Sequence, residues 1–109
     1  MPETTITAEA ALVTQVTVFT CAEERQHELV AALEKAIAEV FVHQRGFLSA
    51  NVLASRDKTR VLNYAQWATI EDFDAMRGHR DVQEQMAHII NIAESSDPRL
   101  YDVKAVAHR

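Results

Sequence analysis

Four stretches of the chain alternate between apolar and polar residues in the manner of half-buried strands. They are rich in β-branched and aromatic residues and cover residues 12–21, 47–55, 60–67 and 100–106. The third stretch is unusual because both of its faces are largely apolar and both carry polar groups. Asn63 and Trp67 share one face, while Leu62 and Tyr64 lie on the other. We therefore expect this strand to be covered on both sides.

Apolar residues at intervals of three and four predict a long amphipathic helix between the first two strands. Thr20 and Glu23 form a capping box at its start, and the periodic pattern continues to about Gln44. Gly46 then ends the helix. The charged residues along its outer face are those of an ordinary solvated surface.

A second helical region follows the third strand. The capping pair and the apolar positions of a short helix are Thr69 with Asp72, then Ile70, Phe73 and Met76. Gly78 interrupts the pattern, and a third helix is expected over residues 82–93. The run Ser-Ser-Asp-Pro at residues 95–98 predicts a break before the last strand.

The order of these elements matches one known arrangement of strands and helices. Strand, helix, strand, strand, helix with an extra helical turn, and strand is the order of the ferredoxin-like split βαβ fold. We therefore predict an α+β protein with a four-stranded antiparallel sheet and helices on one face. A single layer of helices leaves the apolar side chains on the other face of the sheet exposed to water. We therefore predict a homodimer whose two sheets face each other. The polar turn at residues 56–59 leaves the register of the hairpin open.

Length and composition narrow the class of protein. The 109 residues, 48% of them hydrophobic, are expected to form one domain over residues 12–109 after a flexible N-terminal extension at residues 1–11. The formal charge of −5 disfavours nucleic acid as a partner. A single cysteine, Cys21, allows no disulfide within the chain. With no signal peptide and no membrane-spanning run, we expect a cytoplasmic protein without a membrane partner.

Asn63 and Trp67 are the first candidates for a functional site. An amide in the middle of a half-apolar strand costs free energy unless it finds hydrogen-bond partners. It either caps a neighbouring loop or meets a buried water, or it donates to a ligand oxygen that carries developing negative charge. Trp67 is a large core residue on the first interpretation and a flat binding surface with one donor on the second. Together the two residues suit a flat aromatic ligand with polar edges.

The remaining candidates are a histidine and two methionines. If the third helix extends backwards, His79 lies near its apolar face and is the better histidine candidate for a general base. The competing interpretation, which the sequence favours, is a loop histidine after Gly78 without a role. Met76 and Met86 are core residues or walls of a pocket for apolar ligands. No three residues are expected to form a metal site. With glycine only at positions 46 and 78, phosphate-binding and dinucleotide-binding loops are excluded.

Several blocks of sequence resemble the antibiotic biosynthesis monooxygenase family. They are Gly-Phe-Leu-Ser-Ala at 46–50, Asp-Lys-Thr-Arg at 57–60, Asn-Tyr-Ala-Gln-Trp at 63–67 and Glu-Asp-Phe at 71–73. The likeness covers nearly the whole chain and is strongest to the branch of the actinorhodin-pathway quinone-forming monooxygenases. It implies a dimeric α/β-barrel built from ferredoxin-like subunits.

The resemblance also implies a reaction. Members of that branch oxidise an anthrone-type polyketide to a quinone with molecular oxygen and need no flavin, metal or haem. Carried over by position, Asn63 and Trp67 are pocket residues that bind the substrate and stabilise its anion. Phe73 stands where that branch has a pocket tyrosine, and Gln85 or Met86 stands near a pocket arginine. With both of those groups replaced, His79 is the substitute base that the sequence offers.

Two alternatives stay open at this point. A haem-degrading monooxygenase of the same superfamily would use a histidine after the tryptophan as the iron ligand, and His79 is the residue that this role requires. A non-catalytic protein that binds an aromatic intermediate would need the pocket but no base.

Overall fold

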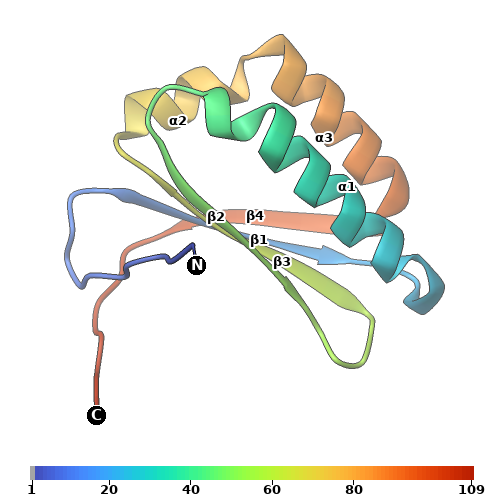
Figure 1. The fold of residues 1–109 in the computed structure, drawn as a ribbon, viewed down its shortest axis with the longest axis horizontal. Helices are drawn as coiled ribbons and strands as arrows, with labels where there is room; N and C mark the ends of the chain where they lie inside the picture. The colour runs from blue at the N-terminus through green and yellow to red at the C-terminus, as the bar shows by residue number, and fades with distance from the viewer. Residues whose placement is uncertain (1) are drawn as a thin grey trace.

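A four-stranded antiparallel sheet with its three α-helices on one face forms the frame of the molecule (Figure 1). The computed structural model describes residues 2–109. The strands are β1 (Val13–Thr20), β2 (Phe47–Ala54), β3 (Arg60–Trp67) and β4 (Ser95–Tyr101), in the spatial order β2-β3-β1-β4. The helices are α1 (Gln26–Glu39), α2 (Ile70–Arg77) and α3 (Arg80–Ile92). This is the ferredoxin-like α+β fold that the sequence predicts, with an open sheet in the single chain.

The apolar faces of the helices meet the sheet in two clusters of buried residues. The larger cluster joins α1, α3 and the central strands through Phe19, Leu29, Leu33, Val61 and Ile89 and their neighbours. The smaller cluster joins the end of β3 to α2 and α3 and consists of Trp67, Phe73, Met76 and Val82. Phe41 and Met86 pack against both clusters. Removal of this apolar surface from water is the main force that holds the helices on the sheet.

The register of the hairpin between β2 and β3 places Asn63 opposite Val52 and Ala65 opposite Ala50. A bulge between Phe47 and Ser49 interrupts this pairing. One extra residue in a strand reverses the side on which the preceding side chain lies. Simple alternation would put Phe47 on the same face as Ser49, but the bulge turns Phe47 to the other face, where it packs against Trp67 under the helices.

The last strand begins earlier than the sequence predicts. The expected break at residues 95–98 is wrong, because β4 starts at Ser95 and ends at Tyr101. Pro98 lies opposite Thr17 on the edge of the sheet. An edge strand tolerates proline because one side of its backbone needs no partner. The Thr20 and Ser95 hydroxyls lie 2.5 Å apart and join the strand ends.

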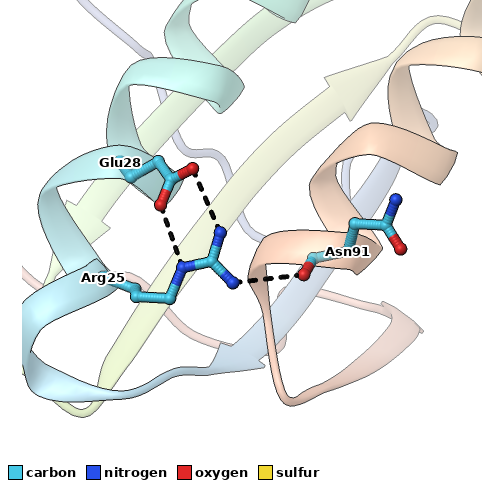
Figure 2. A network of polar contacts seen from close by, with 3 residues as sticks. All are labelled: Arg25, Glu28 and Asn91. Atoms are coloured by element: carbon cyan, nitrogen blue, oxygen red, sulfur yellow. Dashed lines mark hydrogen bonds and ion pairs between the residues drawn. The ribbon is translucent and has the colours of Figure 1, made fainter.

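The first helix also differs from its prediction at both ends. It is preceded by a 3-10 turn, η1 (Glu23–Arg25), and followed by another, η2 (Phe41–His43), and no side chain caps either turn. Instead, the Arg25 guanidinium donates to the Glu28 carboxylate at 2.9 and 3.1 Å and to the Asn91 carbonyl oxygen at 3.4 Å (Figure 2). This contact ties the start of α1 to the end of α3 and lowers the pKa of the Glu28 carboxyl.

The second capping signal is confirmed. The Thr69 hydroxyl accepts a hydrogen bond from the Asp72 backbone N–H at 3.1 Å and so fixes the start of α2. The Asp72 carboxylate lies 3.5 Å from the Arg45 guanidinium. These contacts hold α2 directly after the end of β3.

The face of the sheet away from the helices carries the N-terminal residues, and both chain termini lie on that side (Figure 1). The Thr4 hydroxyl donates to Asn51 Oδ1 at 2.6 Å, and Gln66 Nε2 donates to the Thr5 carbonyl oxygen at 2.8 Å. Gln66 Oε1 in turn accepts from the Ser49 hydroxyl at 2.8 Å. Both the nitrogen and the oxygen of the Gln66 amide thus have a hydrogen-bond partner. Among residues 2–109, no helix is long and apolar enough to cross a bilayer.

Gly46 is the glycine whose replacement should destabilise the fold. Its φ is +80°, and a Cβ at this position would overlap the Asp72 carboxylate. We expect Gly46→Ala to lower the free energy of unfolding by about 1 to 3 kcal/mol, measured by urea denaturation.

Gly78→Ala is the matched control. Gly78 has a φ of −85°, and an added Cβ would lie 3.7 Å from the Ala75 carbonyl oxygen, an ordinary contact. The unfolding midpoint of this variant should match or exceed that of the parent. Equal stability of the two alanine variants would refute this account of Gly46.

Candidate functional site

A cavity of about 380 Å³ lies between the sheet and the helices. Its floor is formed by side chains of the sheet, mainly from β1, β2 and β3, and α1, α2 and α3 supply most of its walls. The wall residues are mainly apolar: Leu33, Ile37, Phe41, Phe47, Phe73, Met76, Val82 and Met86. This volume falls within the range of small-molecule sites, which are typically apolar with a few placed polar groups.

Trp67 forms the centre of an aromatic cluster at one end of the cavity. The indole is only 1% exposed, and its ring meets Phe47 and Phe73 edge to face at centroid distances of 5.6 and 6.4 Å. Such arrangements add to the gain from burial because the positive ring edge meets the negative ring face. The cluster therefore offers a rigid apolar wall to a flat ligand.

A chain of polar side chains crosses the floor beside this cluster. The Trp67 indole N–H donates to Gln15 Oε1 at 3.3 Å, and Gln15 Nε2 donates to the Thr17 hydroxyl oxygen at 3.3 Å. Thr17 pairs with Asn63 in the register of β1 and β3. The four polar side chains thus form one continuous strip on the cavity floor.

Asn63 is the member of this strip whose amide oxygen lacks a partner. Its side chain lines the cavity, and its Oδ1 is buried without a hydrogen bond from residues 2–109. A buried amide group left in this state costs about 1 to 3 kcal/mol. A ligand hydroxyl or N–H that donates to Oδ1 would recover part of that cost.

Arg77 supplies a cation to the wall of the cavity. It belongs to the last turn of α2, and its guanidinium carbon lies 5.7 Å from the centre of the Phe73 ring. Within residues 2–109, the side chains that line the cavity include no carboxylate, imidazole or amine. The site can donate hydrogen bonds and stabilise negative charge, but it has no residue that accepts a proton readily at neutral pH.

The structure brings five of the seven predicted site residues to the cavity. These are Asn63, Trp67, Phe73, Met76 and Met86. Gln85 and His79 are not among the lining residues. The roles assigned to these side chains stay predictions, but their positions are now fixed.

His79 lies outside the cavity because it caps the third helix. Its Nδ1 accepts a hydrogen bond from the Asp81 backbone N–H at 3.2 Å, and the residue is exposed. The imidazole is not among the side chains that line the cavity. This geometry gives no support to His79 as a general base or as the haem ligand that a haem-degrading enzyme would need.

Gln15, Thr17 and Arg77 are site residues that the sequence did not single out. Because side chains alternate along β1, Thr17 lies on the same face as the apolar Phe19. This alternation is the sequence feature that could have predicted Thr17 as part of the cavity floor. Arg77 gave no signal, because a cation in the last turn of a helix is common on any surface. No group of three or more His, Cys, Asp or Glu side chains within residues 2–109 is placed to hold a metal ion.

Comparison with known proteins identifies the family. Residues 12–88 match the antibiotic biosynthesis monooxygenase family. The chain belongs to this family. It is also 42% identical over 81 residues to tetracenomycin-F1 monooxygenase of Streptomyces glaucescens, a match that covers 74% of this chain and 70% of the relative. The chain is accordingly a monooxygenase of this family, as its sequence blocks predict.

Solved structures show the same fold at lower identity. A variant of SnoaB, a cofactor-independent oxygenase from Streptomyces nogalater, is 21% identical and superposes with a TM-score of 0.78 over 89% of this chain and 97% of that chain. A protein from Shewanella oneidensis is 22% identical, with a TM-score of 0.72 over 84% of this chain and 89% of that chain. Both confirm the predicted ferredoxin-like fold.

Filling the cavity should weaken the binding of a flat aromatic ligand. Ala50 lines the floor opposite Ala65, so Ala50→Leu adds three carbons where the ligand would lie. We expect the affinity for 1,8-dihydroxyanthraquinone, measured by quenching of Trp67 fluorescence, to fall by about tenfold or more.

Ala54→Leu is the control on the same strand. Ala54 is exposed at the end of β2 and is not among the lining residues. The affinity of the Ala54→Leu variant for the anthraquinone should equal that of the parent. An undiminished affinity of Ala50→Leu would mean that the ligand binds elsewhere.

Proposed function

We propose that this protein is a cofactor-independent monooxygenase that oxidises a polycyclic aromatic substrate of the anthrone type to a quinone with molecular oxygen. Its 42% identity to tetracenomycin-F1 monooxygenase and its place in the family support this reaction class. The observation that carries the proposal is the apolar cavity with the Asn63 amide and the Trp67 cluster on its floor.

The shape and polarity of the cavity suit such a substrate. Flat rings would stack beside the Trp67 cluster, and oxygen atoms on the ring edge would meet the polar strip of Gln15, Thr17 and Asn63. Apolar walls also exclude water, which strengthens hydrogen bonds to a developing anion.

The reaction needs an electron-rich substrate rather than a redox group on the protein. Loss of a proton from the activated ring carbon gives an enolate, which transfers electrons to oxygen and forms a carbon–oxygen bond as a hydroperoxide. Elimination of water then breaks the oxygen–oxygen bond and leaves the quinone carbonyl. One oxygen atom enters the product and the other leaves as water, so the substrate itself is the reductant.

The protein would promote the first step by lowering the pKa of the bound substrate. Asn63, Thr17 and Arg77 offer hydrogen bonds and positive charge to the enolate oxygen, which is the form of catalysis that preorganised donors provide. Because no carboxylate, imidazole or amine within residues 2–109 lines the cavity, we assign proton removal to water or hydroxide. The rate should then rise with pH as the bound substrate ionises.

The outer face of the sheet supports a second part of the proposal, a homodimer. Val16, Val18, Leu53, Leu62 and Tyr64 are neighbours on this face in the register of β1, β2 and β3. The Tyr64 hydroxyl is buried there without a hydrogen bond from residues 2–109. A second copy placed sheet to sheet would cover these side chains and give the barrel that the family resemblance implies.

Oxygen uptake by metal-free protein with dithranol tests the reaction. The parent should consume oxygen above the background rate of the buffer and form the corresponding anthraquinone. Asn63→Ala and Trp67→Phe should lower kcat by about tenfold or more, because each removes a polar group from the floor. Binding of dithranol without oxygen uptake would instead indicate a non-catalytic binding protein.

His79→Asn is the control for this experiment. Asparagine preserves the helix cap and removes the imidazole, so the oxygen uptake rate should not change if His79 has no role in the chemistry. A large loss of rate in this variant would restore His79 as the base.

Light scattering at micromolar concentration tests the homodimer. The parent should have twice the mass of one chain. Leu62→Glu should produce a monomer, because it places a carboxylate in the proposed interface. Ile90→Glu, on the exposed face of α3, should stay dimeric. A monomeric parent would refute the dimer.

A further inference from the structure

The polar strip on the cavity floor has a fixed hydrogen-bond direction. An indole N–H can only donate, so the Gln15 atom that lies 3.3 Å from Trp67 Nε1 must be the amide oxygen. The other end of the amide, Nε2, is then a donor, and it lies 3.3 Å from the Thr17 hydroxyl oxygen. Trp67 therefore sets the orientation of Gln15, and Gln15 sets the role of the Thr17 oxygen as an acceptor.

The Thr17 hydroxyl still has a hydrogen to donate. Its oxygen accepts from Gln15 and has no further side-chain or backbone partner among residues 2–109. The residue is 4% exposed, and it lines the cavity. A buried hydroxyl hydrogen without an acceptor costs free energy. The space into which this hydrogen can turn is the cavity.

We propose that Gln15 is a positioning residue that holds the Thr17 hydroxyl as a hydrogen-bond donor to an oxygen atom of the bound ligand. The ligand class rests on the proposed function: an aromatic ring system with a carbonyl or phenolate oxygen at its edge. Thr17 lies beside Asn63 in the strand register, so both polar groups meet the same edge of the ligand. The indole N–H of Trp67 acts on the ligand through this chain rather than directly.

Binding of 1,8-dihydroxyanthraquinone tests the donor. Thr17→Val keeps the shape of the side chain and removes the hydroxyl. The affinity of this variant for the anthraquinone, measured by calorimetry, should be about tenfold lower than that of the parent. The pKa of the bound phenol, measured from its visible absorption, should rise because its anion loses a donor. Thr17→Ser should restore both values. Anthracene, which has no oxygen, should bind the parent and Thr17→Val equally.

Gln15→Glu tests the positioning role. A carboxylate at this place accepts from Trp67 and also from Thr17, so it turns the hydroxyl hydrogen away from the ligand. The loss of affinity should equal that of Thr17→Val. In the Thr17→Val background the same change should add no further loss, whereas simple charge repulsion would weaken binding equally in both backgrounds.

Three results would overturn the proposal. They are an unchanged affinity and phenol pKa in Thr17→Val, an equal loss for anthracene, and failure of the parent to bind the anthraquinone. None of these measurements requires turnover. A protein that binds as expected but consumes no oxygen would therefore refute the proposed reaction and leave the role of Gln15 and Thr17 supported.

Discussion

The packing of Trp67 between two phenylalanine rings is the contact on which both the fold and the cavity depend. Trp67 ends β3, Phe47 starts β2 and Phe73 belongs to α2, so the cluster joins three elements at one point. The indole N–H adds a fourth element through Gln15 on β1. Truncation of a buried aromatic side chain of this size to alanine costs about 3 to 5 kcal/mol of stability. The same rings that anchor α2 also form the end wall of the cavity.

The two faces of β3 differ in how their amides are satisfied. On the outer face, Gln66 donates to the Thr5 carbonyl and accepts from Ser49. On the inner face, the Asn63 amide oxygen has no partner within residues 2–109. A folded protein keeps few buried polar groups in this state unless a ligand or water meets them. The unpartnered Asn63 oxygen supports the proposal that a ligand binds on the inner face.

The cavity combines hydrogen-bond donors with the guanidinium of Arg77, and no carboxylate, imidazole or amine within residues 2–109 lines it. Such a site favours the ionised form of a weakly acidic ligand without removing the proton itself. A ligand that ionises near neutral pH therefore suits it better than one that needs a strong base. Membership of a monooxygenase family is consistent with this chemistry, because an electron-rich anion can reduce oxygen directly.

The sequence alone determined the order of the elements and the faces of β3, because local periodicity records which side of a strand or helix is apolar. Asn63 and Trp67 were found this way. The family followed from the resemblance of the sequence blocks at 46–50, 57–60, 63–67 and 71–73. The tertiary structure decided what depends on contacts between distant residues. Gln15 and Trp67 are 52 positions apart, and the bulge that turns Phe47 inward and the early start of β4 both follow from pairing with another strand. The position of His79 outside the cavity lining likewise depends on how α2 and α3 pack on the sheet, whereas its capping bond to Asp81 is local.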